Sequence, residues 1–94
     1  MNLLERSVAD AMELSTKHKD GHQWVEAQPD AWCCMDGWTK LHNIADKLMD
    51  EHKIETEYFG RRWSATCEGV SAQHQDRKTA ALMAFCKHKG VAYE

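Results

Sequence analysis

The sequence lacks long apolar runs, glycine clusters and low-complexity segments, and it contains a single proline. Without about 18 consecutive apolar residues, no segment is expected to cross a membrane. Because the five glycines are isolated from one another, a glycine-rich phosphate loop is excluded. No repeat or linker divides the 94 residues, so we expect one domain covering residues 1–94.

An export leader is not expected either. Glu5, Arg6 and Asp10 interrupt the segment where the apolar core of a leader would lie. Thiols of a protein that is not exported stay reduced. The sequence therefore predicts a cytoplasmic protein with free cysteines. These are Cys33, Cys34, Cys67 and Cys86.

The composition is that of a globular protein, and its charge is unevenly spread. Hydrophobic residues make up 43% and charged residues 29% of the chain, which argues against disorder. The net charge is −3, but segment 26–57 holds eight acidic residues against three lysines. Segment 58–94 holds six basic residues against three acidic ones. The acidic segment indicates either a solvated surface or a patch that meets a basic partner.

Segment 54–67 predicts a β-hairpin whose register follows from its turn. With Gly60-Arg61 as a two-residue loop and Gly60 at the positive φ of a type II′ turn, Tyr58 pairs with Trp63. This register separates an apolar face from a charged face, as a half-buried hairpin requires. The apolar face holds Ile54, Thr56, Tyr58, Trp63, Ala65 and Cys67, and the other face holds Glu55, Glu57, Arg62, Ser64 and Thr66.

Three segments show the apolar spacing of helices. They are residues 2–19, 37–52 and 73–89. Asn2 and Asp36 are the expected caps of the first two, and Gly90 is expected to end the third. The face expected to be buried in the second helix comprises Trp38, Leu41, Ile44, Ala45, Leu48 and Met49.

The segment 22–35 predicts either two short strands, at about 23–35, or one strand and a tight loop. Pro29 suits the second position of a type I turn between them. Combined with the hairpin and the helices, this predicts the α+β class. We expect a small sandwich in which an antiparallel sheet is packed by three helices.

Metal and catalytic sites find little support in the spacing of cysteines and histidines. Cys33 and Cys34 are adjacent, so in a strand they point to opposite faces and do not share a metal. His18 and His22 have suitable spacing, but they span an expected helix end. A further set of possible metal ligands would come close together only if the fold brings the ends of strands and helices to one place. It comprises Cys67, His74, Cys86 and His88.

Catalysis is not expected. Cys67 and Cys86 lie on faces expected to be buried, where the pKa of a thiol rises and its nucleophilicity at neutral pH falls. No inward-facing pair of carboxylates is evident. We therefore predict a protein that is not an enzyme, with no cofactor and no assigned metal, and we keep a small zinc-binding protein as an alternative.

Nucleic-acid binding is another alternative. Arg77-Lys78 followed by Ala80-Ala81 is similar to the last helix of a double-stranded-RNA-binding domain, which offers lysines to phosphates. The Gly-x-Gly and double-lysine patterns of that family are absent, and the net charge is negative. The alternative site is a basic patch of Arg61, Arg62, Arg77 and Lys78. The competing explanation is that Arg62 pairs with Glu55 or Glu57 across the hairpin.

The second half of the chain carries a family resemblance. From Ile54 through Trp63-Ser64-Ala65 to the helix at 80–85, it resembles small phage-encoded α/β proteins of the ABA-sandwich type. These end in a strand with a Trp-x-Ala pattern and an alanine-rich helix that closes at Lys/Gly. The resemblance implies a phage or mobile-element origin. Small acidic phage proteins of this length often bind a host protein stoichiometrically, for example as anti-CRISPR inhibitors.

We therefore predict a non-enzymatic protein-binding module that inhibits a host nuclease or defence complex through an acidic face. The partner is expected to be a host protein or a protein–nucleic-acid complex. An exposed Trp would serve as anchor, although burial of Trp24 and Trp32 under the first helix is the other expectation. The predicted partner-binding residues are Asp46, Asp50, Glu51, Glu55, Glu57, Trp24 and Trp32.

Overall fold

The computed structural model describes residues 3–91, and within them the chain forms helices and strands in the order α-βββ-αα-βββ-α. The elements are α1 (Leu3–Ala11), β1 (Thr16–Lys19), β2 (His22–Gln28), β3 (Ala31–Cys34), α2 (Trp38–Leu41), α3 (Ile44–Glu51), β4 (Glu55–Phe59), β5 (Arg62–Cys67), β6 (Val70–His74) and α4 (Arg77–His88). The predicted α+β class is confirmed.

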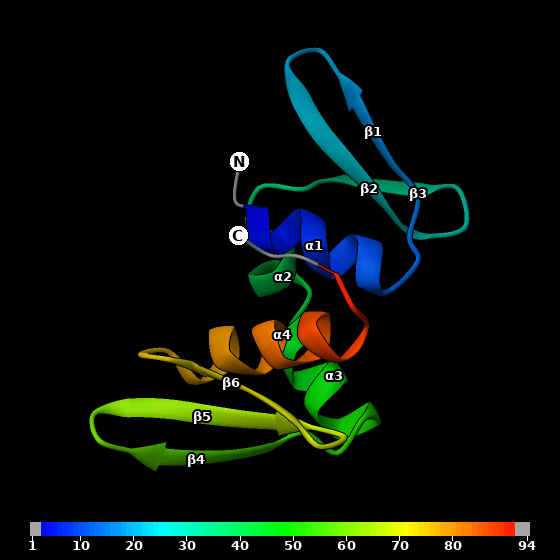
Figure 1. The fold of residues 1–94 in the computed structure, drawn as a ribbon. Helices are drawn as coiled ribbons and strands as arrows, with labels where there is room; N and C mark the ends of the chain where they lie inside the picture. Colours follow the sequence, from blue (N-terminus) through cyan, green and yellow to red (C-terminus); the bar gives the residue numbers. More distant parts are fainter. Residues whose placement is uncertain (1–2, 92–94) are drawn as a thin grey trace.

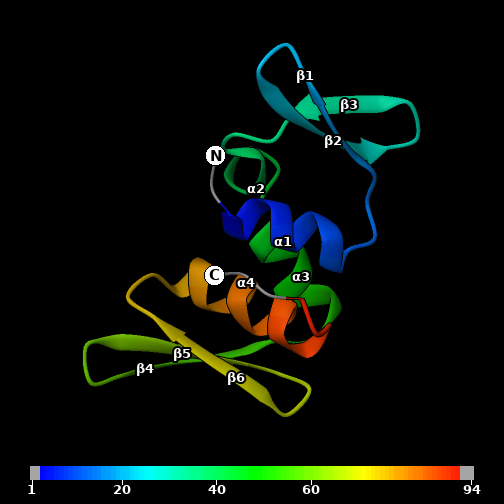
Figure 2. The ribbon, with the colours of Figure 1, turned by 45° about the horizontal axis from the view of Figure 1, so that its top comes forward.

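The strands form two separate antiparallel sheets, and the helices lie between them. Sheet A has the order β1-β2-β3 and sheet B the order β4-β5-β6. The two sheets occupy opposite ends of the molecule, with α1 and α2 next to sheet A and α3 and α4 next to sheet B (Figures 1 and 2). The molecule is elongated, with extents of 42 × 22 × 22 Å. The prediction of one sheet packed by three helices was therefore wrong in its arrangement.

The register of the central hairpin is confirmed. Thr56 pairs with Ala65, Tyr58 with Trp63, and Phe59 with Arg62. The predicted type II′ turn is wrong, because Gly60 and Arg61 both have positive φ, at 59° and 68°. Two positive φ values define a type I′ turn, whose twist matches that of the two strands.

A third strand continues this sheet where the sequence predicted only a turn and then a helix. Glu68 and Gly69 form a second loop with positive φ at both residues, and Cys67 pairs with Val70 across it. The helix expected to begin at 73 begins instead at Arg77. Gln73 and His74, which were expected to open the helix, pair with β5 instead.

The apolar face of the hairpin is buried only at one end. Ala65 and Cys67 are fully buried, and α4 packs along β5 and β6 at this end. Trp63 is half-buried, whereas Tyr58 is 59% exposed. The expectation that Tyr58 lies in the core is therefore wrong, because the strands extend past the helix that covers their base.

The predicted helix at 2–19 is wrong beyond Ala11. Glu13 adopts a positive φ of 60°, and the N–H of Leu14 donates to the carbonyl of Ala9 at 2.9 Å, which ends the helix. Residues 16–19 form β1 and pair with β2 across an Asp20-Gly21 turn. The expected cap Asn2 lies outside the described residues.

The predicted helix at 37–52 is divided in two. Asn43 has a φ of 50°, so the chain turns sharply between α2 and α3. Trp38, at the start of α2, is buried as expected, but Leu41 is 78% exposed. Leu41 therefore does not belong to the buried face, because the break rotates α2 relative to α3. The expected cap Asp36 is also wrong, since the N-cap of α2 is Gly37.

The two strands expected in 22–35 are confirmed as β2 and β3. The turn between them is not type I, because Asp30, which follows Pro29, has a φ of 61°. A positive φ at that position is typical of a type II turn.

The last helix has clear caps at both ends. The carboxylate of Asp76 accepts hydrogen bonds from the N–H and hydroxyl of Thr79 at 2.9 and 2.7 Å. The side-chain and backbone hydrogen bonds from Thr79 lower the pKa of Asp76. Gly90, with a φ of 74°, ends the helix as predicted.

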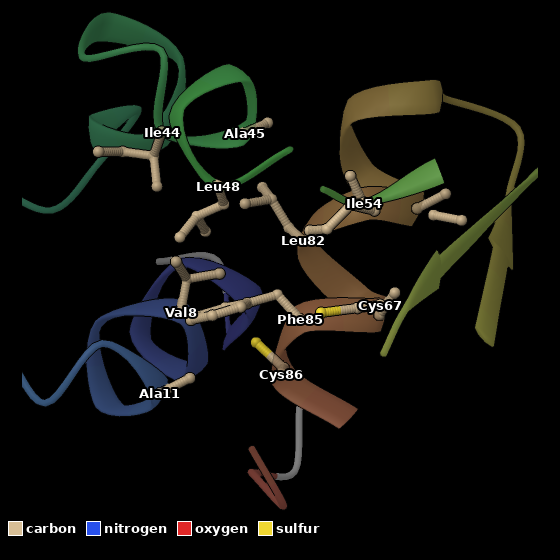
Figure 3. Close-up of a cluster of buried hydrophobic side chains, with 14 of the residues drawn as sticks. Val8, Ala11, Ile44, Ala45, Leu48, Ile54, Cys67, Leu82, Phe85 and Cys86 are labelled. Carbon is tan, nitrogen blue, oxygen red and sulfur yellow. The ribbon is translucent and has the colours of Figure 1, made fainter. Parts of the chain in front are cut away.

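One hydrophobic core joins the layers. Val8 of α1, Leu48 of α3 and Phe85 of α4 meet in a buried cluster (Figure 3). Val25 of sheet A and Cys67 of sheet B belong to the same cluster. Because the helices contribute apolar side chains toward both sheets, neither sheet forms a core of its own.

A buried carboxylate fixes the start of α2 against α1. Glu5 is only 7% exposed, and its oxygens accept from the N–H of Gly37 at 3.0 Å and from the N–H of Thr39 at 2.9 Å. The Thr39 hydroxyl also donates to it, at 3.2 Å. Free N–H groups at a helix start attract a negative charge, so Glu5 supplies the cap that α2 lacks locally.

Replacing Glu5 tests this cap. Glu5→Ala should lower the free energy of unfolding by about 2–3 kcal/mol, because buried N–H groups lose their acceptor. Glu13→Gln, an exposed change at the end of the same helix, is the matched control and should change stability by less than about 0.5 kcal/mol. Urea unfolding followed by circular dichroism measures both. Equal effects of the two changes would contradict the assignment.

Burial of Cys86 makes stability depend on pH in the alkaline range. Burial, with a smaller contribution from Asp10, raises the pKa of the thiol from 9.0 to about 12. The unfolded chain therefore loses this proton above about pH 9 while the folded chain keeps it. Stability should fall between about pH 9 and pH 12, by up to about 1.4 kcal/mol per pH unit.

Cys86→Ala removes this contribution and should flatten the decline, even if it also lowers stability at neutral pH. Urea unfolding at about pH 8 and about pH 10 measures the difference. Cys34→Ala is the matched control and should keep the decline. An unchanged slope in Cys86→Ala would show that other groups cause it.

Candidate functional site

The predicted acidic residues are all exposed, but the structure divides them. Asp46 lies beside α4, where Lys78 approaches its carboxylate at 3.3 Å. Glu55 and Glu57 lie on the face of β4 that points away from α4, since the alternate residue Thr56 faces that helix. Within the predicted acidic set, the charge of Asp46 is therefore balanced by Lys78, whereas Glu55 and Glu57 face solvent on the other side of the sheet.

Two further acidic residues lie at the C-terminal end of α3. Asp50 and Glu51 are exposed there, just before the chain enters sheet B. Together with Glu55 and Glu57 they belong to the end of the molecule that sheet B forms (Figure 1). An acidic surface at this end would therefore consist of four residues and not the predicted five.

The predicted basic residues do not gather on one face. The Nε of Arg77 donates to the Thr56 hydroxyl at 2.9 Å, and its guanidinium lies 5.8 Å from the ring centre of Trp63. Arg62 shares the opposite face of the sheet with Glu57, and Arg61 lies in the turn. Lys78 is paired with Asp46, so the patch expected for nucleic acid is dispersed.

The free end of sheet B carries exposed aromatic side chains. Tyr58 and Trp63 pack with their ring centres 5.2 Å apart. Phe59, next to the turn, is 75% exposed. Phe59 pairs with Arg62 and so lies on the charged face of the hairpin, in solvent.

Both remaining tryptophans lie on the face of sheet A that points away from the helices. Val25 is fully buried on the inner side, so its neighbours Trp24 and Glu26 face outward. The pairing of Glu26 with Trp32 puts Trp32 on the same side. Burial under α1 is therefore not what the structure shows. The outer face of sheet A is defined by Lys17, Lys19, His22, Trp24, Glu26, Trp32 and Cys34.

Local contacts hold the two indoles on this face. The ammonium of Lys17 lies 4.2 Å from the ring centre of Trp32. The indole N–H of Trp24 donates to the carbonyl of Lys19 at 3.2 Å. Both tryptophans are half-buried, and Trp32 also lines a cavity that Trp38 and Ile44 border. The outer face of sheet A therefore presents two ordered indoles between positive side chains.

A cleft of about 710 Å³ lies between the helices, lined in part by Glu5, Thr39, Lys40 and Lys78. Its polar groups are largely occupied. The Glu5 carboxylate is bound by α2, and Lys78 pairs with an acidic residue of α3. This arrangement does not point to a particular reaction.

The thiols differ in their surroundings. Burial raises the pKa of both Cys67 and Cys86. Burial first, and then the neighbouring Cys34, raises the pKa of Cys33. Cys34 itself is half-buried on the outer face of sheet A.

The metal-ligand sets weighed from the sequence are not brought together among residues 3–91. His88 instead pairs with Glu68 at 2.6 Å. The structure places a different group within reach of one ion, namely His22, Cys34 and Asp36, whose ligand atoms lie within 4.8 Å of one another. Spacing alone missed it because His22 belongs to β2, Cys34 to β3 and Asp36 to the link after β3. The Pro29-Asp30 turn signal lay between the strands that bring His22 and Cys34 together, β2 and β3.

Comparison with known proteins gives no relative: no family model, curated protein or solved structure matches this chain. Within residues 3–91, no helix is long and apolar enough to cross a membrane.

The surroundings of the thiols predict the order of their modification. Iodoacetamide should alkylate Cys34 first in the native protein, because thiols with a raised pKa and no exposure hold little thiolate at neutral pH. Cys67 and Cys86 should react only on global unfolding. Peptide mass spectrometry over time measures each rate, and early modification of Cys86 would contradict the placement.

Proposed function

We propose that the protein is a non-enzymatic protein-binding module whose contact surface is the outer face of sheet A. The observation that carries the proposal is the position of Trp24 and Trp32 on a face that points away from the helices. Tryptophan is the residue most enriched at the energetic centres of protein interfaces, where it fills a pocket of the partner.

The surroundings of the indoles support this proposal. The contacts of Trp32 with Lys17 and of Trp24 with the Lys19 carbonyl hold the rings before any partner arrives. Ordered side chains lose less conformational entropy on binding, which favours affinity. Lys17, Lys19 and Glu26 supply a charged rim around the apolar centre, as in many protein interfaces.

Protein is the favoured partner over nucleic acid. Phosphate binding depends on several cations acting on one surface. The predicted basic residues Arg61, Arg62, Arg77 and Lys78 are instead dispersed over two faces and a turn, and two of them are engaged with neighbours.

The narrower prediction remains part of the proposal. It holds that a phage or mobile element encodes the protein, which inhibits a cytoplasmic host nuclease or defence complex. The resemblance of the second half of the sequence supports it, and so do the four free cysteines. In this version Asp50, Glu51, Glu55 and Glu57 contact basic residues of the partner.

Removing the indoles tests the contact surface. A Trp24→Ala, Trp32→Ala double variant should lose binding to a host-lysate partner by at least tenfold, because interface tryptophans commonly contribute about 2 kcal/mol or more. A Tyr58→Ala, Phe59→Ala variant removes exposed aromatics at the opposite end and is the matched control. Pull-down with quantitative mass spectrometry measures capture, and circular dichroism verifies folding.

Full capture by the double tryptophan variant would overturn the proposal. Loss of the captured material after nuclease treatment, together with a steep decrease in binding with salt, would favour the nucleic-acid alternative.

Charge reversal tests the acidic surface separately. Asp50→Lys, Glu51→Lys should weaken partner binding by at least tenfold and leave the melting temperature within about 2 °C, because both side chains are exposed to solvent. Asp30→Lys, a reversal near sheet A, is the control. Undiminished binding would remove the acidic surface from the proposal while leaving the tryptophan surface intact.

A further inference from the structure

Three side chains of different ligand type meet where β2 begins and β3 ends. They are an imidazole from His22, a thiol from Cys34 and a carboxylate from Asp36. One ligand atom from each lies within 4.8 Å of the other two. His22 and Asp36 are exposed, and Cys34 is half-buried.

The strand ladder brings these residues together. Cys34 pairs with Trp24, and His22 lies two residues before Trp24, so both point to the outer face of sheet A. The N–H of Met35 donates to the carbonyl of Gln23 at 2.9 Å, which keeps the chain beside β2 after β3 ends. Asp36, two residues after Cys34, returns to the same side.

Backbone pairing therefore brings His22 and Cys34 to one end of the outer face, with Asp36 next to them. The link that carries Asp36 leads directly from sheet A into α2 (Figure 1). Its end is held in turn by the Glu5 carboxylate, which binds the N–H of Gly37 at 3.0 Å. The ligand set is thus anchored on both sides of Asp36.

The side chains are also available for a ligand. Within residues 3–91, none of the three donates or accepts a side-chain hydrogen bond, and none forms an ion pair. They differ in this respect from Glu5, Asp46 and His88, whose polar atoms are engaged with protein partners.

The chemistry of this ligand set selects a transition metal. A thiolate and an imidazole are poor ligands for magnesium and calcium but favoured ligands for zinc. Carboxylate is an accepted third ligand, and zinc centres with three protein ligands keep the fourth tetrahedral position for water.

The distances suit such a centre after small movements. Zinc–ligand bonds of about 2.0–2.3 Å give tetrahedral edges of about 3.3–3.8 Å. The ligand atoms lie within 4.8 Å of one another, so they have to approach by at most about 1.5 Å, which rotation of exposed His22 and Asp36 permits.

We propose that His22, Cys34 and Asp36 form a zinc-binding site with one open coordination position. The site shares the outer face of sheet A with the aromatic anchors of the proposed function, but it consists of different residues, and its test requires no partner protein. A negative result for the zinc site therefore does not contradict the proposed protein-binding function, and the reverse also holds.

Cobalt replaces zinc as a spectroscopic probe of the full-length reduced protein. Titration with Co²⁺ should produce a thiolate-to-cobalt charge-transfer band and visible bands of tetrahedral cobalt, saturating at one ion per chain. Zn²⁺ should then displace the cobalt and abolish the bands. Cys34→Ser should eliminate the charge-transfer band, and His22→Ala and Asp36→Ala should each weaken cobalt binding at least tenfold.

Two neighbouring residues supply matched controls. Cys33→Ala removes the adjacent thiol, which faces the other side of the strand, and His18→Ala removes an exposed imidazole of β1. Both variants should bind cobalt as the wild type does. Circular dichroism shows whether each variant folds.

The same variants give a second readout that does not use colour. Zn²⁺ should raise the melting temperature of the wild type and of both controls, but not that of Cys34→Ser, since a ligand that binds only the folded state stabilises it. The proposal is overturned if cobalt gives no charge-transfer band, if the band survives Cys34→Ser, or if one ion is bound by two chains.

Discussion

The contact between the Glu5 carboxylate and the start of α2 is the constraint on which the arrangement of the N-terminal half depends. Within residues 3–91, Glu5 is the one buried residue that carries a formal charge. Burial of a charge is unfavourable unless hydrogen bonds compensate it, and the N–H groups of Gly37 and Thr39 do so. The contact joins residues 32 and 34 positions apart. It therefore connects α1 to the start of α2, the helix that follows sheet A in the chain.

The second constraint is the shortness of the elements. Among the described residues no helix exceeds 12 residues and no strand exceeds 7. Such elements are not stable alone, so they share one core through the helix layer. The chain must also reverse direction repeatedly, and seven described residues other than glycine adopt a positive φ for this purpose. Asn43 and Glu13 are two of them, and both end helices that the apolar pattern would have continued.

These reversals explain what the sequence predicted and what it did not. The 54–67 register was predictable because a two-residue loop fixes every pair beyond it. The helix at 2–19 failed at Thr16, where pairing with β2 competes with helical spacing and depends on residues far along the chain. Tyr58 and Leu41 were expected in the core because the sequence predicts which face of an element is apolar. It does not predict how much of that face a neighbouring element covers. For Trp24 and Trp32 the sequence left two expectations open, since strand alternation decides the side of a residue only after the register is known.

The same reasoning explains why the ligand set escaped the sequence. Its members are separated by twelve residues and by two, a spacing that matches no zinc motif and becomes meaningful only when β2 and β3 pair. A shift of one residue in this pairing would turn Cys34 toward the helices and separate it from His22. Trp24 would turn inward with a similar shift of β2. The tryptophan anchors and the ligand set therefore depend on one ladder, even though they differ in chemistry. That ladder is in turn held at its end by the Gly37 contact with Glu5. A change at this buried carboxylate would affect both the tryptophan anchors and the ligand set on the outer face of sheet A, whereas changes in sheet B, at the other end of the molecule, would leave them in place.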